Sequence, residues 1–154
     1  MRWPTKTAAV PALTGALFTV DFPLMPAFTY KRRIAFHETD AAGVVYFANY
    51  FRLAEEAETH AMASLGSIVT RDGYLYPRVH AEADYQAPLQ FFDEVSVHAC
   101  IVRIGSSSIT WKFEISSGNT LCATVQMVSA RRQKDGSAAP YSAGEREALA
   151  TLQA

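Results

Sequence analysis

The sequence has no large excess charge of either sign, no long apolar segment and only two cysteines. Its formal net charge of −1 over 154 residues gives no reason to expect nucleic acid or an anionic membrane surface as a partner. Its apolar runs are all shorter than the roughly 20 residues with which a helix crosses a bilayer, so no membrane span is expected.

Clear metal-ligand and export patterns are also missing. Cys100 and Cys122 lie in strand-like segments without the spacing of a metal site, which favours two thiols in a cytoplasmic protein over a disulfide. No other cluster of metal ligands is visible, so no metal or cofactor is expected. Residues 1–27 contain a mildly apolar run but no clear cleavage site. We therefore predict a flexible N-terminal extension and a cytoplasmic location rather than export.

The sequence does contain enough apolar residues for one compact core. Hydrophobic residues make up 49% of the chain and charged residues 19%, which is typical of a folded protein rather than a disordered one. The length suits one domain, which we place at residues 28–135, followed by a C-terminal segment at 136–154. Within that segment, Ser142 with Glu145 three residues later predicts the start of a short helix.

Hydrophobic periodicity predicts five strands and one long helix. The first strand runs from Phe28 to about Phe36, and helical spacing then holds from about Val45 to Leu65, along an alanine-rich stripe. Four more strands follow from alternating apolar residues, at Val79–Tyr85, Val95–Ile101, Ile109–Ile115 and from Leu121 to about Arg132. This order indicates an α+β fold in which a five-stranded antiparallel sheet wraps around one long helix. Open sheet edges make edge-to-edge self-association the expected outcome.

The segment that joins the first strand to the helix, His37–Tyr50, carries the candidate site. Asp40 lies between the two elements, and Gly43 follows where the backbone must turn tightly or approach a ligand closely. An isolated Asp before a helix would usually be an N-cap. Here the carboxylate would lie beside N–H groups of the first helical turn, which have no intrahelical partner and attract anions and developing oxyanions. We predict that this segment is the active site.

This segment reads Asp40-Ala41-Ala42-Gly43-Val44-Val45-Tyr46-Phe47-Ala48-Asn49-Tyr50 without a gap. With the predicted element order, it resembles the hotdog-fold acyl-CoA thioesterases, and in particular the 4-hydroxybenzoyl-CoA thioesterase branch that includes the YbgC-type enzymes. The patterns Ala83–Pro88 and Phe92–Val95 support the resemblance, which covers about residues 28–132. YbgC-type sequences usually have His where this chain has Phe47, and the difference favours the hydroxybenzoyl-type sequences.

The resemblance implies a hotdog fold and a homodimer with sheets joined edge to edge and active sites at the interface. We expect dimers to pair into a homotetramer, although the sequence leaves dimer and tetramer open. The resemblance also implies roles for three motif residues. Asp40 would be the nucleophile or the general base for water, and the main-chain N–H of Phe47 would polarise the thioester carbonyl. Gly43 would shape the turn between them.

The remaining motif side chains are candidate substrate-binding residues. Tyr46 and Tyr50 suit packing better than acid–base chemistry, Asn49 either caps the helix or orients the site, and His37 could tune the catalytic carboxylate. The helix also carries three carboxylates, Glu55, Glu56 and Glu58. We interpret them as a solvated face, and leave open that one of them assists catalysis.

The expected function is hydrolysis of an aromatic or fatty acyl-CoA to the free acid and CoA, in which CoA is part of the substrate and no cofactor is needed. The leaving thiolate is fairly stable, since the reference thiol pKa is about 8.5, so a strong general acid is not essential. Asp40 could attack to give a mixed anhydride or could activate water. Two alternatives stay open: an acyl-carrier-protein thioesterase of polyketide or fatty-acid metabolism, and a non-catalytic hotdog protein that binds an acyl ligand.

Overall fold

The computed structural model describes residues 27–66 and 73–154, so nearly all of the predicted N-terminal extension lies outside the described residues. β1 (Phe28–Arg33) leads through a short 3-10 helix, η1 (Phe36–Glu38), to the long helix α1 (Asn49–Ser64). Four strands follow, β2 (Arg78–Tyr85), β3 (Glu94–Ile104), β4 (Ser108–Ser117) and β5 (Thr120–Ala130). The chain ends with the short helix α2 (Ala143–Ala150).

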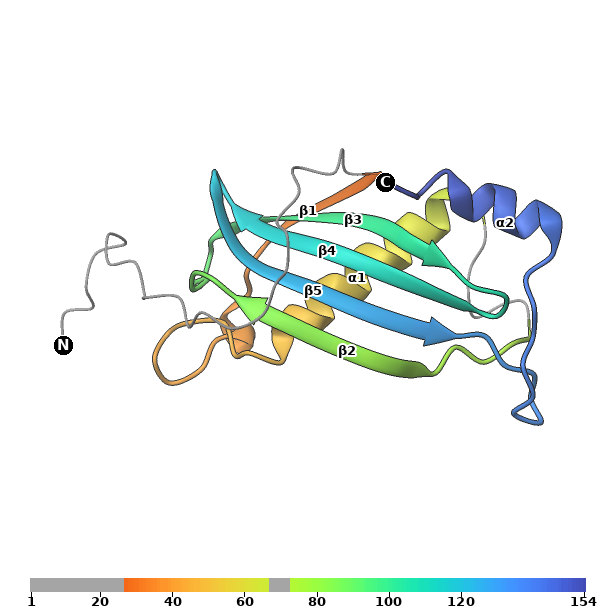
Figure 1. Ribbon diagram of the computed structural model, residues 1–154. Coiled ribbons are helices and arrows are strands. Elements are labelled where there is room, and N and C mark those ends of the chain that lie inside the picture. Colours follow the sequence, from red (N-terminus) through yellow and green to blue (C-terminus); the bar gives the residue numbers. More distant parts are fainter. Residues whose placement is uncertain (1–26, 67–72) are drawn as a thin grey trace, which may run out of the picture.

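The five strands form one antiparallel sheet in the order β1-β3-β4-β5-β2, and α1 lies along one face of it (Figure 1). α1 contacts all five strands, as expected if the sheet wraps around it. A tight turn at Gly118, where φ is +56°, connects β4 to β5. The predicted α+β fold is therefore confirmed, and β1 and β2 form the two edges of the sheet.

The core lies between α1 and the inner face of the sheet. The helix turns a narrow row of fully buried residues to the sheet: Leu53, Ala54, Ala57 and Ala61. Three of these four side chains are alanines, which lets the helix axis approach the strands closely. The largest buried side chains, Trp111 and Phe113 on β4, belong to the same core as these alanines. The alanine-rich stripe read from the sequence is thus the packing face of α1.

Two predicted boundaries are wrong, and both errors lie beside the candidate site. β1 ends at Arg33 rather than Phe36 because the chain turns into η1, which leaves the Phe36 side chain 76% exposed. α1 begins at Asn49 rather than Val45. Val44 and Val45, which the periodicity places at or next to the helix start, are extended instead. Val44 forms a β-bridge with Gln90, and Val45 forms one with Thr39.

The C-terminal segment packs on the same core. The predicted capping box is present at the start of α2, where Ser142 Oγ accepts the Glu145 N–H and the Glu145 carboxylate accepts the Ser142 N–H. Leu149 and Leu152 are buried. Cys100 and Cys122 are separate buried thiols of the described sheet, as predicted. No helix within residues 27–66 and 73–154 combines the length and apolar character that a membrane crossing requires.

Candidate active site

Asp40 lies in a tight loop between η1 and α1. The loop is closed at its base by a bridge between Thr39 and Val45 and by a 2.8 Å hydrogen bond from the Asp40 N–H to the Val44 carbonyl. Inside it, the Gly43 N–H donates to the Asp40 carbonyl at 2.9 Å, and the φ of Gly43 is +77°. Glycine adopts this conformation without strain, so the turn itself favours a glycine at position 43.

The Asp40 side chain is exposed at the mouth of this loop. Its Oδ1 accepts the N–H of Ala42 at 2.8 Å, which fixes the orientation of the carboxylate. Within the described residues, Oδ2 accepts no hydrogen bond. One carboxylate oxygen therefore orients the group, and the other is available to a water molecule or a substrate.

A groove of about 400 Å³ runs from Asp40 along the start of α1 to the end of β2. Such a volume suits a small-molecule site. Its lining combines the loop, the segment before α1 and the end of β2, namely Asp40, Val44, Val45, Tyr46, Phe47, Tyr50, Tyr85, Gln86, Ala87 and Pro88. Tyr46 and Phe47 are 48% and 57% exposed, and their rings contact each other with centroids 4.6 Å apart. The carboxylate thus shares an open groove with exposed aromatic rings.

The backbone at the start of α1 leaves N–H groups without acceptors. The first three bonds of this turn run from Asn49 to Tyr46, from Tyr50 to Phe47 and from Phe51 to Ala48. Among the described residues, no acceptor binds the N–H of Phe47, and the positive end of the helix dipole lies here. The carbonyl of Phe47 is held by the Tyr85 hydroxyl, which donates to it at 3.0 Å. Phe47 therefore presents an available N–H donor, and its carbonyl, in the next peptide unit, is anchored.

Tyr50 anchors the floor of the groove. It is 4% exposed, its hydroxyl accepts the Leu89 N–H at 3.2 Å, and its ring meets that of Tyr85 edge to face. Burial raises the pKa of Tyr50 above its ordinary value, so the hydroxyl stays protonated at neutral pH. These contacts agree with a packing role rather than an acid–base role.

The other two candidate substrate-binding residues lie differently. Asn49 is the first residue of α1, with Ala48 as the N-cap, and its Nδ2 donates to the Glu38 carbonyl at 2.8 Å. It therefore links α1 to η1 instead of capping the helix. His37 lies in η1 with an exposed side chain, and within the described part of the chain it makes no hydrogen bond to Asp40.

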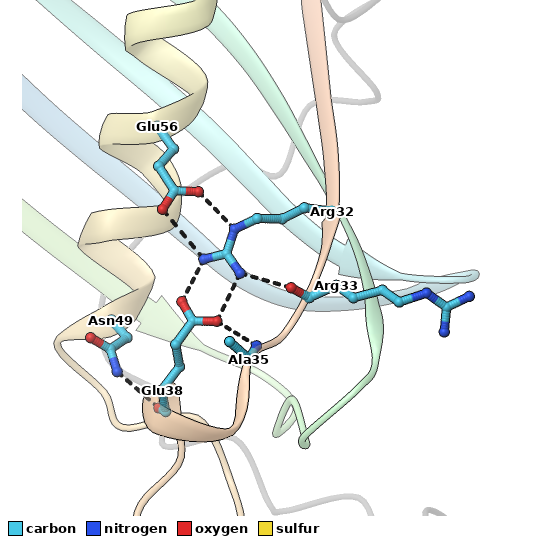
Figure 2. A network of polar contacts seen from close by, with 6 residues as sticks. All are labelled: Arg32, Arg33, Ala35, Glu38, Asn49 and Glu56. Carbon is cyan, nitrogen blue, oxygen red and sulfur yellow. Dashed lines mark hydrogen bonds and ion pairs between the residues drawn. The ribbon is translucent and has the colours of Figure 1, made fainter.

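An ion-pair network behind the loop was not predicted from the sequence. Figure 2 shows the guanidinium of Arg32 between the carboxylates of Glu38 in η1 and Glu56 in α1. Glu38 is 6% exposed, and the hydrogen bonds from Arg32, with a further one from Ala35, hold the pKa of its carboxyl below the ordinary value. The signal was present, because Arg32 interrupts the alternation of the first strand.

The interpretation of the helix carboxylates as a solvated face is wrong for two of the three. Glu56 binds Arg32 at 2.7 Å, and Glu58 binds Arg78 of β2 at 2.6 Å with a side chain only 14% exposed. Both carboxylates therefore tie α1 to an edge strand. In the described part of the chain, no three His, Cys, Asp or Glu side chains gather as metal ligands would.

Comparisons with known proteins agree with this fold. A model of the Thioesterase-like superfamily matches residues 34–143. The chain is 33% identical over 109 residues to a 1,4-dihydroxy-2-naphthoyl-CoA hydrolase of Synechococcus elongatus, which covers 68% of this chain and 80% of the relative. A solved 1,4-dihydroxy-2-naphthoyl-CoA thioesterase from Synechocystis has a TM-score of 0.74 at 27% identity, covering 81% of this chain and 96% of that one. A gentisyl-coenzyme A thioesterase has a TM-score of 0.72 at 25% identity, covering 79% and 98%.

Proposed function

This chain belongs to the thioesterase-like superfamily, and from that premise we propose that it is a thioester hydrolase that converts an acyl-CoA to the free acid and CoA. Among aromatic and fatty acyl groups, aromatic ones are favoured. The naphthoyl and gentisyl groups in the names of similar proteins are aromatic, and the groove beside Asp40 carries exposed aromatic rings. Aromatic rings of substrate and protein stack in offset or edge-to-face contact, which adds to the binding free energy.

Asp40 would start the reaction in one of two ways. Either its carboxylate attacks the thioester carbonyl to form a mixed anhydride, which water then hydrolyses, or it removes a proton from the attacking water. In both routes the C–S bond breaks and CoA leaves as a thiolate, which takes up a proton. The observation that carries the proposal is that Asp40 and Phe47 border one groove, and that the N–H of Phe47 has no acceptor among the described residues.

The N–H of Phe47 would stabilise the oxyanion that forms on the thioester carbonyl. Removing one donor of this kind typically costs about 2.7–4 kcal/mol of transition-state stabilisation. Gly43 would contribute by allowing the turn that brings the carboxylate to the groove, since its φ is +77°. Tyr46 would contact the acyl group, whereas Tyr50 and Asn49 would support the groove through the Leu89 N–H and the Glu38 carbonyl.

The active protein would be a cytoplasmic homodimer joined along the β2 edge, and two dimers would form a tetramer. β2 is an edge strand whose residues are exposed on both faces, including Val79 at 57% and Tyr85 at 47%. An open edge of this kind readily pairs with a second copy. Because the Tyr85 hydroxyl binds Phe47, a partner on this edge would lie beside the groove. Light scattering would test the assembly, and a monomer at micromolar concentration would contradict it.

The experiment that tests the function is thiol release from a panel of CoA esters with short, long and aromatic acyl groups. We expect turnover that is highest for hydroxylated aromatic esters. Release only from acyl groups carried on a pantetheine-bearing carrier protein would instead indicate a carrier-protein thioesterase. Binding of acyl-CoA without release would indicate a non-catalytic ligand-binding protein. Either result would refute the proposed activity.

A further inference from the structure

A buried carboxylate, Glu38, lies two residues before Asp40 in the chain. Its side chain is 8% exposed, and its two oxygens face the guanidinium of Arg32 in a two-point contact. Glu38 Oε2 also accepts the N–H of Ala35 at 2.7 Å, which closes η1. Arg32 reaches further, since its Nε donates to Glu56 of α1 at 2.7 Å. The Glu38 side chain is therefore fixed to both β1 and α1, as Figure 2 shows.

The main chain of Glu38 is tied to the other side of the site. Its carbonyl accepts two hydrogen bonds, from the N–H of Tyr46 at 2.9 Å and from the Nδ2 of Asn49 at 2.8 Å. Tyr46 directly precedes Phe47, whose N–H is the proposed oxyanion donor. One residue therefore holds the segment that carries the donor and also begins the loop that carries the carboxylate.

The loop is attached to the rest of the fold near its two ends. Its base is closed by the Thr39–Val45 bridge, and its C-terminal side is held by the Val44–Gln90 bridge and by the Val45 N–H, which donates to the Leu89 carbonyl at 2.8 Å. The bonds of Asp40 itself are internal to the loop, to Ala42, Gly43 and Val44. On its N-terminal side, the position of Asp40 relative to Phe47 is thus set at the base, where Glu38 is anchored and also binds the Tyr46 N–H. Reaction rates depend steeply on such placement, and an error of about 1 Å can cost about 100-fold.

We propose that Glu38 and Arg32 are positioning residues, which hold Asp40 and the Phe47 N–H at a fixed separation across the groove. The inference rests on the proposed function, because that function gives both groups their roles. Neither Glu38 nor Arg32 touches the groove, whose lining contains neither residue. Their substitution should therefore change the rate of the chemical step more than the binding of the substrate.

Three variants test the inference. Glu38→Gln keeps the shape of the side chain and removes its charge, and Arg32→Lys removes the two-point contact. Arg33→Lys is the matched control, since the neighbouring Arg33 pairs only loosely with the exposed Glu94, at 3.7 Å, and lies over the Phe92 ring. The readouts are kcat and KM for the best CoA ester, the thermal unfolding temperature, and the NMR signals of the Asp40 and Phe47 backbone amides.

We expect Glu38→Gln and Arg32→Lys to lower kcat by about 10- to 100-fold with KM within about twofold, at temperatures where both variants are folded. The Asp40 and Phe47 amide signals should move in both variants and stay in place in Arg33→Lys, whose kcat should stay within about twofold of wild type. If a single variant does not fold, Arg32→Met with Glu38→Met removes both charges together, which is better tolerated than one unpaired buried charge. The double variant should show the same loss of kcat.

A kcat within about twofold of wild type in folded Glu38→Gln, or an equal loss in Arg33→Lys, would overturn the inference. If wild type releases no thiol from any ester, the proposed function fails, and the amide signals alone decide the positioning. Signals that move in Glu38→Gln and not in Arg33→Lys would then support it. Unchanged Asp40 and Phe47 signals would refute it.

Discussion

The ion pair between Arg131 and Glu145 fastens α2 to the end of β5, and its removal should lower stability in a pH-dependent way. Glu145 Oε1 lies 2.9 Å from Arg131 Nη2, and the Arg131 side chain is only 3% exposed. The Glu145 carboxylate also accepts the Ser142 N–H at 2.7 Å in the capping box. Since Gln fits the same position of a capping box, Glu145→Gln removes the charge and keeps the helix start.

The magnitude follows from the ionisation of Glu145. The hydrogen bond from Arg131, and then that from Ser142, lowers the pKa of Glu145 from 4.5 to about 2. At about 1.4 kcal/mol per pKa unit this would be worth roughly 3.4 kcal/mol. The Glu145 side chain is 42% exposed, however, and water screens the pair, so we expect about 1–2 kcal/mol. Because the folded pKa is the lower one, this stability is present above about pH 4.5 and is lost as the pH falls toward 2.

Urea unfolding of wild type and Glu145→Gln at pH 7 and at pH 3 measures the effect. The variant should be less stable by about 1–2 kcal/mol at pH 7, and less than half of that difference should remain at pH 3. Glu147→Gln, an exposed carboxylate on the same helix, is the control and should change stability by less than about 0.5 kcal/mol. A difference that is the same at both pH values, or an equal loss in the control, would refute the reasoning.

Three further substitutions have defined outcomes. Gly43→Ala forces a side chain into φ +77°, which should cost about 1–2 kcal/mol in urea unfolding and lower kcat, although no atom lies within 4 Å of the added Cβ; unchanged values would show that the turn is not strained. Tyr85→Phe removes the donor to the Phe47 carbonyl and should cost about 0.5–1.5 kcal/mol, with a lower kcat in the thiol-release assay; an unaltered kcat would show that this contact does not hold the peptide. Leu53→Ala empties a fully buried position of α1 and should cost about 2–5 kcal/mol in chemical denaturation, whereas a loss below about 1 kcal/mol would contradict the core described for α1.

The strands and the long helix could be predicted because apolar side chains recur with a single clear period along each of them. On β4, Ile109, Trp111, Phe113 and Ile115 are all buried, so the alternation in the sequence is the alternation in the structure. The start of α1 could not be predicted in the same way. Val44 and Val45 continue the apolar pattern toward the helix, and only their bridges to Gln90 and Thr39 make them extended. Gln90 is distant in the sequence and Thr39 lies across a turn, so the hydrophobic periodicity of the segment gives no sign of either bridge.

The candidate site was predictable in part. Asp40 and Gly43 are recognisable because a carboxylate and a positive-φ turn precede a helix. The network of Arg32, Glu38 and Glu56 was missed because each charged residue, taken singly, fits an exposed surface. In this chain, Arg32 stands in β1 where the alternation calls for an apolar residue, and this break was the available signal of its buried partner Glu38.

The most direct test of the central claim compares Asp40→Asn with Asp135→Asn in the thiol-release assay. The two carboxylates make the same local contact, since Asp40 accepts the Ala42 N–H at 2.8 Å and Asp135 accepts the Ser137 N–H at 2.9 Å. Only Asp40 borders the groove. We predict that Asp40→Asn lowers kcat by about 100-fold or more, and that Asp135→Asn stays within about twofold of wild type. Equal activity of folded Asp40→Asn and wild type would contradict the account.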